Sequence, residues 1–204
     1  MEKMEKILEY WFADLDDRSL LKTDSALFRK WFGKDESTDR EIREQFEQDY
    51  LRAVDGEYGA WAGSPRGRLA LVILLDQFPR NMYRGTPRAF AADSQALAIA
   101  LRAIEDGSDQ ELDLIQRMFL YMPLMHAESV EVQKRSLQVF GILVEEARSR
   151  DSLNVNFFAF SREYAVKHSV IIERFGRYPH RNQTLGREST SEEIEFLKGP
   201  DSSF

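Results

Sequence analysis

Seven consecutive apolar residues, 69–75 ("LALVILL"), constrain the fold of this chain more than any other feature. They follow the turn-like "GSPRG" and run on into "DQF", so the segment predicts a helix that is apolar on every side. Such a helix must be covered all round, and the run is far too short to span a membrane. We therefore expect this helix to lie at the centre of a globular core.

Most of the remaining chain shows apolar residues at intervals of three and four, the pattern of amphipathic helices. A Ser or Thr followed three residues later by Glu, a capping box, predicts helix starts at 108–111 and 190–193. The stripe after 108–111 reaches His126, and the stripe on 156–176 includes His168. No segment alternates apolar and polar residues between turn signals. The sequence therefore predicts an all-α fold.

Length and composition set the broad class of protein. A chain of 204 residues can bury a core in one domain, so we expect a single helical domain at 1–198 and a frayed tail at 199–204. The net charge of −7 argues against nucleic acid and anionic membranes as partners. The lack of cysteine excludes disulfides, thiolate nucleophiles and thiolate metal sites. With no signal peptide in the N-terminal segment, we expect a cytoplasmic protein.

Two similar motifs, "LLDQFPRN" (74–81) and "RFGRYPHRN" (174–182), each end a predicted helix with an aromatic residue, a proline and an Arg-Asn pair. Because proline disfavours helical geometry in the residue before it, we expect Pro79 and Pro179 to stop their helices. Asn81 and Asn182 would then satisfy the freed backbone groups. The two arginines would point into one shared pocket.

Three ionisable residues occupy positions where the helical pattern requires apolar ones, namely Asp76, His126 and His168. Burying such groups is costly unless each finds a partner. Each can simply be a core residue bonded to a backbone carbonyl. Alternatively, together with spare backbone groups at the helix ends, they line a pocket.

Arginines are enriched around both motifs. In an acidic chain this local enrichment predicts a patch that faces an anion, since guanidinium binds carboxylate and phosphate in a bidentate way. The alternative is that these arginines pair with the many Asp and Glu residues of the chain. The residues are Arg80, Arg84, Arg88, Arg174, Arg177, Arg181 and Arg187.

Several kinds of chemistry can be weighed from these residues. His126, His168 and His180 with Glu128 or Asp76 could ligate a hydrolytic metal ion, but no H-E-x-x-H pair is present and we predict no metal site. No P-loop or G-x-G-x-x-G occurs, and we predict no cofactor. A metal-free acid–base site, in which Asp76 fixes the tautomer of a histidine, stays open. A protein-binding scaffold is a further alternative.

The motifs, taken with "YMPLMHAES" (121–129), resemble the bacterial family known as domain of unknown function 924, and the likeness extends from 10–12 to 192–197. The resemblance implies a helical fold similar to tetratricopeptide-repeat proteins and implies no activity. Ala127 departs from the family, in which we expect serine. The positions that match the family are Asp76, Gln77, Pro79, Arg80, Asn81, His126, Glu128, His168, Pro179, His180, Arg181 and Asn182.

We expect antiparallel helix pairs in a right-handed, tetratricopeptide-like array, with one polar pocket that binds a small anion or a peptide carboxylate. Alternatives are an interaction scaffold and a hydrolase that uses a His/Asp/Glu site. The candidate catalytic residues are His126, His168 and Asp76. The candidate ligand-binding residues are Asp76, Gln77, Arg80, Asn81, His126, Glu128, His168, Arg177, His180, Arg181 and Asn182.

Overall fold

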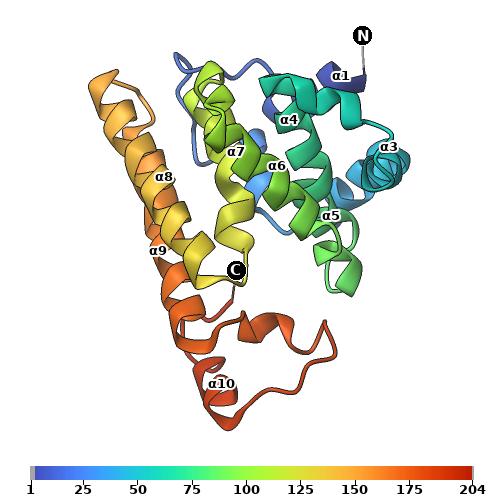
Figure 1. The fold of residues 1–204 in the computed structure, drawn as a ribbon, viewed down its shortest axis with the longest axis vertical. Helices are drawn as coiled ribbons and strands as arrows, with labels where there is room; N and C mark the ends of the chain where they lie inside the picture. The colour runs from blue at the N-terminus through green and yellow to red at the C-terminus, as the bar shows by residue number, and fades with distance from the viewer. Residues whose placement is uncertain (1–2, 204) are drawn as a thin grey trace.

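The computed structural model describes residues 3–203, and Figure 1 shows helices connected by loops and short turns. No strand occurs within this described range, which confirms the predicted all-α class. The tetratricopeptide-like array stays a prediction. Residues 1 and 2 of the predicted domain and residue 204 of the predicted tail lie outside the described residues. The α-helices are α1 (Lys3–Phe12), α2 (Ala26–Phe32), α3 (Glu36–Val54), α4 (Pro65–Val72), α5 (Phe78–Met82), α6 (Asp93–Glu105), α7 (Leu114–His126), α8 (Val130–Ser149), α9 (Val155–Phe175) and α10 (Ser191–Phe196).

The apolar run 69–75 lies at the centre of the core, as the sequence predicts. All seven side chains are buried in α4 and in the π-helical segment Ile73–Gln77 that follows it. Helix α4 packs against α1, α6 and α7. A run that is apolar on every side is stable here because helices cover it on several sides.

Pro79 does not stop the central helix, so the predicted break at Phe78 is wrong. Phe78 has helical angles (φ −61°, ψ −40°), and its N–H donates to the carbonyl of Ile73, five residues earlier. A proline in a regular α-helix clashes with the carbonyl four residues before it and lacks a donor. The wider π turn (Ile73–Gln77) relieves both conflicts, because its hydrogen bonds skip one more residue. The chain therefore runs directly into α5.

Helix α7 begins later than the sequence predicts. Residues Ser108–Glu111 form a short 3₁₀ turn and not the first turn of the helix. The helix starts at Leu114, where Asp113 and Gln116 form the capping box. An Asp with Gln three residues on satisfies the same two backbone donors as Ser with Glu, so either box could begin the helix. The second predicted box, Thr190 with Glu193, is confirmed at the start of α10.

The C-terminal part of the chain follows a long antiparallel pair formed by α8 and α9 (Figure 1). Helix α9 ends at Gly176, which has the left-handed conformation (φ 70°). Tyr178 is extended, and Pro179–Arg181 forms a 3₁₀ turn. The helix has therefore already ended before Pro179, and the glycine ends it.

The predicted tail makes contacts in its described part, 199–203. Ser202 is buried and donates to the carbonyl of Leu197 at 3.2 Å. Asp201 pairs with Lys167 of α9 at 2.8 Å. Separately, none of the helices in 3–203 combines the length and the apolarity needed to cross a membrane.

Candidate functional site

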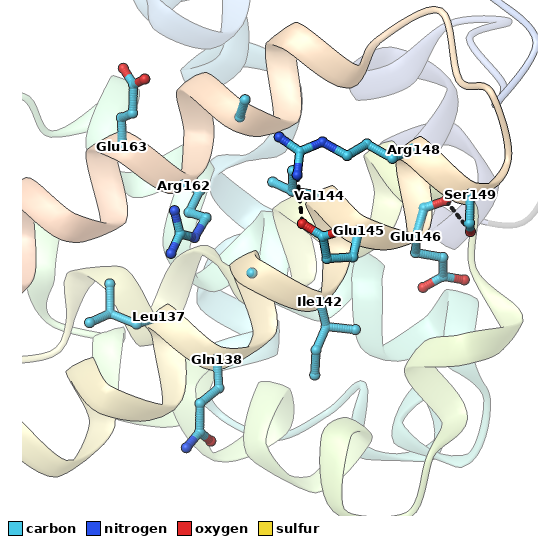
Figure 2. Close-up of a pocket in the computed structure, with 12 residues that line it drawn as sticks. Leu137, Gln138, Ile142, Val144, Glu145, Glu146, Arg148, Ser149, Arg162 and Glu163 are labelled. Atoms are coloured by element: carbon cyan, nitrogen blue, oxygen red, sulfur yellow. Dashed lines mark hydrogen bonds and ion pairs between the residues drawn. The ribbon is translucent and has the colours of Figure 1, made fainter.

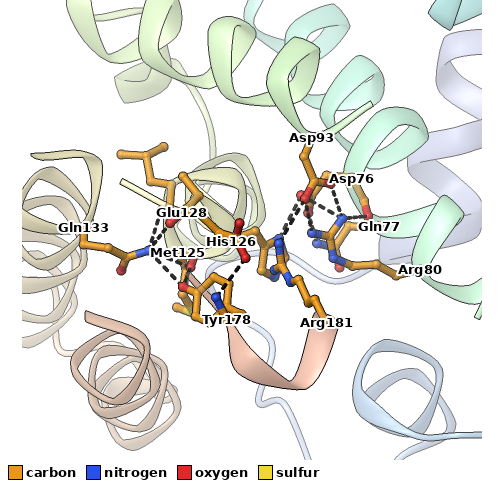
Figure 3. A network of polar contacts seen from close by, with 12 residues as sticks. Asp76, Gln77, Arg80, Asp93, Met125, His126, Glu128, Gln133, Tyr178 and Arg181 are labelled. Atoms are coloured by element: carbon orange, nitrogen blue, oxygen red, sulfur yellow. Dashed lines mark hydrogen bonds and ion pairs between the residues drawn. The ribbon is translucent and has the colours of Figure 1, made fainter. Parts of the chain in front are cut away.

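A fully buried carboxylate, Asp76, is the centre of the polar cluster shown in Figure 3. The π-helical segment places it at the end of the apolar run, facing the end of α7. Its Oδ1 lies 2.8 Å from Nδ1 of His126 and 3.2 Å from Nη1 of Arg80, and its Oδ2 accepts from Nε2 of Gln77 at 2.6 Å. Burial alone would raise the pKa of Asp76, but the charge of Arg80 and these hydrogen bonds outweigh it and lower the pKa to about 2. Asp76 is therefore ionised in the folded protein.

Arg80 is held by three acceptors. Its Nη1 donates to the carbonyl of Asp76 at 2.7 Å and to Oδ1 of Asp93 at 2.8 Å, and its Nη2 donates to Oδ2 of Asp93 at 2.9 Å. Asp93 is the first residue of α6, where a carboxylate also suits the helix N-terminus. The bidentate pair, with the backbone contact, leaves Arg80 little capacity for a further ligand.

Arg181, from the second motif, faces the same Asp93 but is held loosely. Its Nη1 lies 3.5 Å from Oδ2 of Asp93, and its guanidinium lies 4.7 Å from the ring centroid of Phe90 and 4.4 Å from that of Tyr178. The side chain is 8% exposed. Its Nε is buried and has no hydrogen-bond partner in the described part of the chain. Burial, followed by the charge of Arg80, lowers the pKa of Arg181.

Two histidines adjoin this cluster with their Nδ1 atoms engaged. The ring of His168 lies 6.4 Å from that of His126, and its Nδ1 is 2.8 Å from the carbonyl of Tyr164. Because Nδ1 faces an acceptor in both cases, the proton belongs on Nδ1 and the lone pair on Nε2. Burial lowers the pKa of His126, and it lowers that of His168 to about 3. Both rings are neutral at neutral pH.

A second set of contacts fastens the second motif to the end of α7. Glu128 accepts from the backbone N–H of Tyr178 at 2.8 Å and pairs with Arg187 at 2.7 and 3.0 Å. The hydroxyl of Tyr178 donates to the carbonyl of Met125 at 2.6 Å, and Nε2 of Gln133 lies 3.0 Å from the same hydroxyl. These bonds place Arg181 opposite α6. Glu128 is thus a support of the loop beside the cluster.

The structure therefore brings both motifs to one place, as the sequence predicts, although they start 100 residues apart in the chain. Asp76, Arg80, His126, His168 and Arg181 lie together in or next to the cluster.

Other predicted site residues have partners of their own. Arg177 forms a bidentate pair with Glu193 at 2.7 and 2.8 Å, and Asn182 donates to Glu193 and to Ser189. Asn81 donates to the carbonyl of Gln77 at 3.2 Å, which is the predicted bond to a backbone group. Asn182 makes no such bond, because its amide is taken by side chains. Burial lowers the pKa of His180 to about 4.

Comparison with known proteins agrees with this picture of the fold. Residues 7–201 match the family described as "Bacterial protein of unknown function (DUF924)". The chain belongs to this family. A solved structure, a protein of unknown function (ATU0120) from Agrobacterium tumefaciens, is 34% identical, with a TM-score of 0.76, and the match covers 96% of this chain and 97% of that one. A comparison with curated proteins gave no match.

In this member of the DUF924 family, one of the seven arginines around the two motifs differs from the others in its hydrogen bonds. Arg84 pairs with Asp39, Arg174 with Glu192 and Arg88 with the hydroxyl of Tyr83. Arg80, Arg177 and Arg187 are bonded as described above. Arg181 alone of these seven makes no side-chain hydrogen bond within residues 3–203. All seven have an Asp or Glu within ion-pair distance, as the pairing alternative predicts, and a patch of several free arginines does not form.

Two residues of the cluster, Asp93 and Phe90, are not indicated by the sequence analysis. Asp93 reads as an ordinary acidic residue in the first turn of a helix, and Phe90 as one aromatic among many. Only the fold reveals that both face Arg80 and Arg181. A single sequence carries no signal for such a pairing.

Two hollows in the surface lie away from the cluster. One, of about 990 Å³, runs along α8 and α9 and includes Ile142, Glu145 and Arg162 (Figure 2). The other, of about 560 Å³, lies beside α1. Within 3–203, no group of three or more His, Asp or Glu residues is arranged to hold a metal ion.

Proposed function

We propose that the polar cluster binds a small organic anion and that Arg181 is its anchor. The observation that carries the proposal is the state of Arg181, a side chain that is 8% exposed, with a buried Nε that lacks a partner in the described chain and a single 3.5 Å ion contact. Buried cations are normally paired and hydrogen-bonded, because desolvation otherwise costs several kcal/mol. A bound carboxylate would satisfy this guanidinium.

The surroundings favour an anion over a cation. The carboxylates of Asp76 and Asp93 are both engaged by Arg80, whereas Arg181 has only its 3.5 Å ion contact, so the unmet hydrogen-bonding capacity belongs to a cation. The guanidinium of Arg181 makes cation–π contacts with Phe90 and Tyr178, which do not use its N–H groups as hydrogen-bond donors to oxygen. A metal ion beside two guanidinium groups would be repelled.

A single available arginine favours a ligand that presents one carboxylate group to it. A carboxylate matches the fork of one guanidinium, whereas a phosphate dianion normally collects several cationic groups. The ligand class is therefore a small carboxylic acid or the C-terminal carboxylate of a peptide.

Isothermal titration calorimetry tests the proposal with succinate, inorganic phosphate, and trialanine with a free or an amidated C-terminus. We expect a carboxylate to bind the wild type and Arg181→Gln to weaken it at least tenfold. Arg40→Gln, at an exposed position of α3, is the matched control and should leave affinity unchanged. Binding that is unaffected by Arg181→Gln, or no binding of any probe, would refute the proposal.

The hollow along α8 and α9 supports a second candidate, an interaction scaffold within a tetratricopeptide-like array. Ile142 lines it and is 57% exposed, and Val170 on α9 is 56% exposed. Exposed aliphatic side chains beside a groove are typical of protein contacts. If this candidate is right, Ile142→Glu should abolish a co-purifying interaction in a cytoplasmic extract and leave succinate binding intact.

A further inference from the structure

The bond between Asp76 and His126 has the geometry of a general-base pair. The carboxylate is fully buried and ionised, and its Oδ1 lies 2.8 Å from Nδ1 of the ring. This contact fixes the proton on Nδ1 and directs the lone pair of Nε2 away from Asp76. A histidine oriented in this way can accept a proton from water.

His126 also has the access and the surroundings that a base needs. Its side chain is 11% exposed. Nε2 makes no hydrogen bond within the described chain, and this atom is not fully buried. The charged or titratable groups around it are Asp76 and Arg80 from the central helix, Asp93 from α6, His168 from α9 and Arg181 from the loop.

His126 and Arg181 belong to one connected cluster. Arg80 contacts Asp76, the partner of His126, and it shares Asp93 with Arg181 (Figure 3). On the other side, the ring of His168 lies 6.4 Å from His126 and 5.5 Å from Tyr178, on which Arg181 stacks. Arg181 and His126 are thus linked by two short series of side-chain contacts.

We propose that this cluster hydrolyses a small carboxylic ester whose acyl part carries a second, free carboxylate. His126 is the general base, Arg181 binds the free carboxylate and Asp76 is a positioning residue. The inference rests on the anion site proposed above and adds a reaction to it.

The reaction balances without any further reactant. Nε2 of His126 takes a proton from a water molecule as the water oxygen attacks the ester carbonyl carbon, which gives a tetrahedral adduct and an imidazolium ring. The adduct collapses, the bond to the alkoxide oxygen breaks, and Nε2 returns its proton to that oxygen. One ester and one water give one carboxylic acid and one alcohol, and nothing is oxidised or reduced.

The side chains around His126 favour this reaction over two alternatives. The hydrogen bond of His126 within 3–203 is to Asp76, and no serine or threonine hydroxyl lies at hydrogen-bond distance from the ring, so water is the nucleophile. Phosphoryl transfer normally needs several cationic groups or metal ions at the transferred group, and Arg80 is already committed to Asp76 and Asp93. Hydrolysis of an ester does not require several cationic groups or metal ions at the reacting group.

The experiment uses the purified full chain and the monomethyl esters of malonate, succinate, glutarate and adipate, each beside its dimethyl ester. Acid release is followed by pH-stat titration. We expect the wild type to hydrolyse at least one monoester, at a higher kcat/KM than its dimethyl counterpart. His126→Gln should lower kcat about 10²–10⁴-fold, the usual contribution of general-base catalysis. Arg181→Gln should raise KM for the monoester at least tenfold, so that the monoester loses its advantage in kcat/KM over the dimethyl ester.

Asp76→Asn serves as the positioning test, because the amide can still bond to the ring but does not hold the same tautomer. It should change the pH profile of kcat, and circular dichroism checks that it is folded. Arg40→Gln should match the wild type throughout. No hydrolysis of any monoester, or hydrolysis that survives His126→Gln, overturns the reaction. Succinate binding in calorimetry separates the two proposals, since binding without hydrolysis refutes the reaction alone and loss of both refutes the anion site too.

Discussion

The two similar motifs, 74–81 and 174–182, adopt different secondary structures. The first stays helical through its proline, because the π-helical segment Ile73–Gln77 makes room for the ring. The second is already broken three residues before its proline, where Gly176 ends α9. Two motifs that share an aromatic residue, a proline and an Arg-Asn pair thus form a continuous helix in one place and a loop with a 3₁₀ turn in the other.

This difference determines what each arginine can do. Arg80, one turn after Asp76 on a helix, meets the carbonyl and the carboxylate of that residue and the carboxylate of Asp93. Arg181 comes from a loop, where the residue aligned with Asp76 is Gly176, and only Asp93 is within reach. Helix continuity thus provides the first arginine with several partners, whereas the helix break leaves the second with a single 3.5 Å ion contact.

The largest effect that tests this contrast is expected for Asp76→Ala. It removes the acceptor of both Arg80 and His126 in a fully buried place, and losing one member of such a network costs about 3–5 kcal/mol. Urea denaturation measures the free energy of unfolding. Asp14→Ala, on the exposed side of the N-terminal region, is the control and should change it by about 0.5 kcal/mol or less. A similar small change for Asp76→Ala would mean that the first motif is not a structural network.

The same contrast predicts that replacing Arg80 lowers the stability of the fold more than replacing Arg181. Arg80→Gln leaves Asp76 and Asp93 without their main cation, so we expect a loss of about 3 kcal/mol. Arg181→Gln leaves the pair of Arg80 with Asp93 intact and should cost about 1 kcal/mol or less, mainly from the two ring contacts. The measurement is again urea denaturation at neutral pH. Equal losses would contradict the division between a structural and an available arginine.

The sequence predicts much of the fold and part of the site, and the physical reasons differ. The all-apolar run 69–75 and the stripe to His126 follow from periodicity alone, and so does the burial of Asp76 and His168. The continuation of the helix through Pro79 cannot be predicted from periodicity. Proline normally breaks a helix, but here the π turn before it accommodates the ring.

The partners in the cluster are harder still to predict. Asp93 and Phe90 come from a different part of the chain, and their closeness to Arg181 depends on how α6 and the C-terminal loop pack together. Residue type gives no direction to these contacts, so the sequence alone leaves open which histidine or arginine lies against Asp76. The structure shows Arg80 and His126 as its partners.

The two regions should also respond to acid at different pH. Burial lowers the pKa of His168, beside the second motif, from 6.5 to about 3, whereas the pKa of Asp76 falls from 3.8 to about 2. Both folded values lie below the unfolded ones, so both groups stabilise the fold at neutral pH. The contribution of His168 is lost as pH falls from 6.5 toward 3, and that of Asp76 only below about 4.

The measurement is the slope of unfolding free energy against pH. Between pH 6 and 4.5, His168→Gln should reduce this slope by up to about 1.4 kcal/mol per pH unit, the value for one proton. Asp76→Asn should leave the slope in that range unchanged and flatten it below pH 4. A slope above pH 4.5 that is insensitive to His168→Gln would show that this ring is not held neutral by the fold.

The smallest expected effect concerns the glycine that ends α9. Gly176 has φ 70°, and a Cβ added to it would meet no atom within 4 Å, so the cost of Gly176→Ala comes from the backbone alone. The left-handed conformation costs a residue with a Cβ about 1–2 kcal/mol, and we expect a loss of about 1 kcal/mol in urea denaturation. Gly59→Ala is the matched control, since Gly59 has equally open space without a left-handed φ, and it should be nearly neutral.

Gly176→Asn should recover part of the loss, because asparagine tolerates this conformation. If Gly176→Ala and Gly59→Ala behave alike, the break before Pro179 is fixed by the contacts of Tyr178 and Glu128 and not by the glycine. The contrast between the motifs would then originate in tertiary packing, at both prolines.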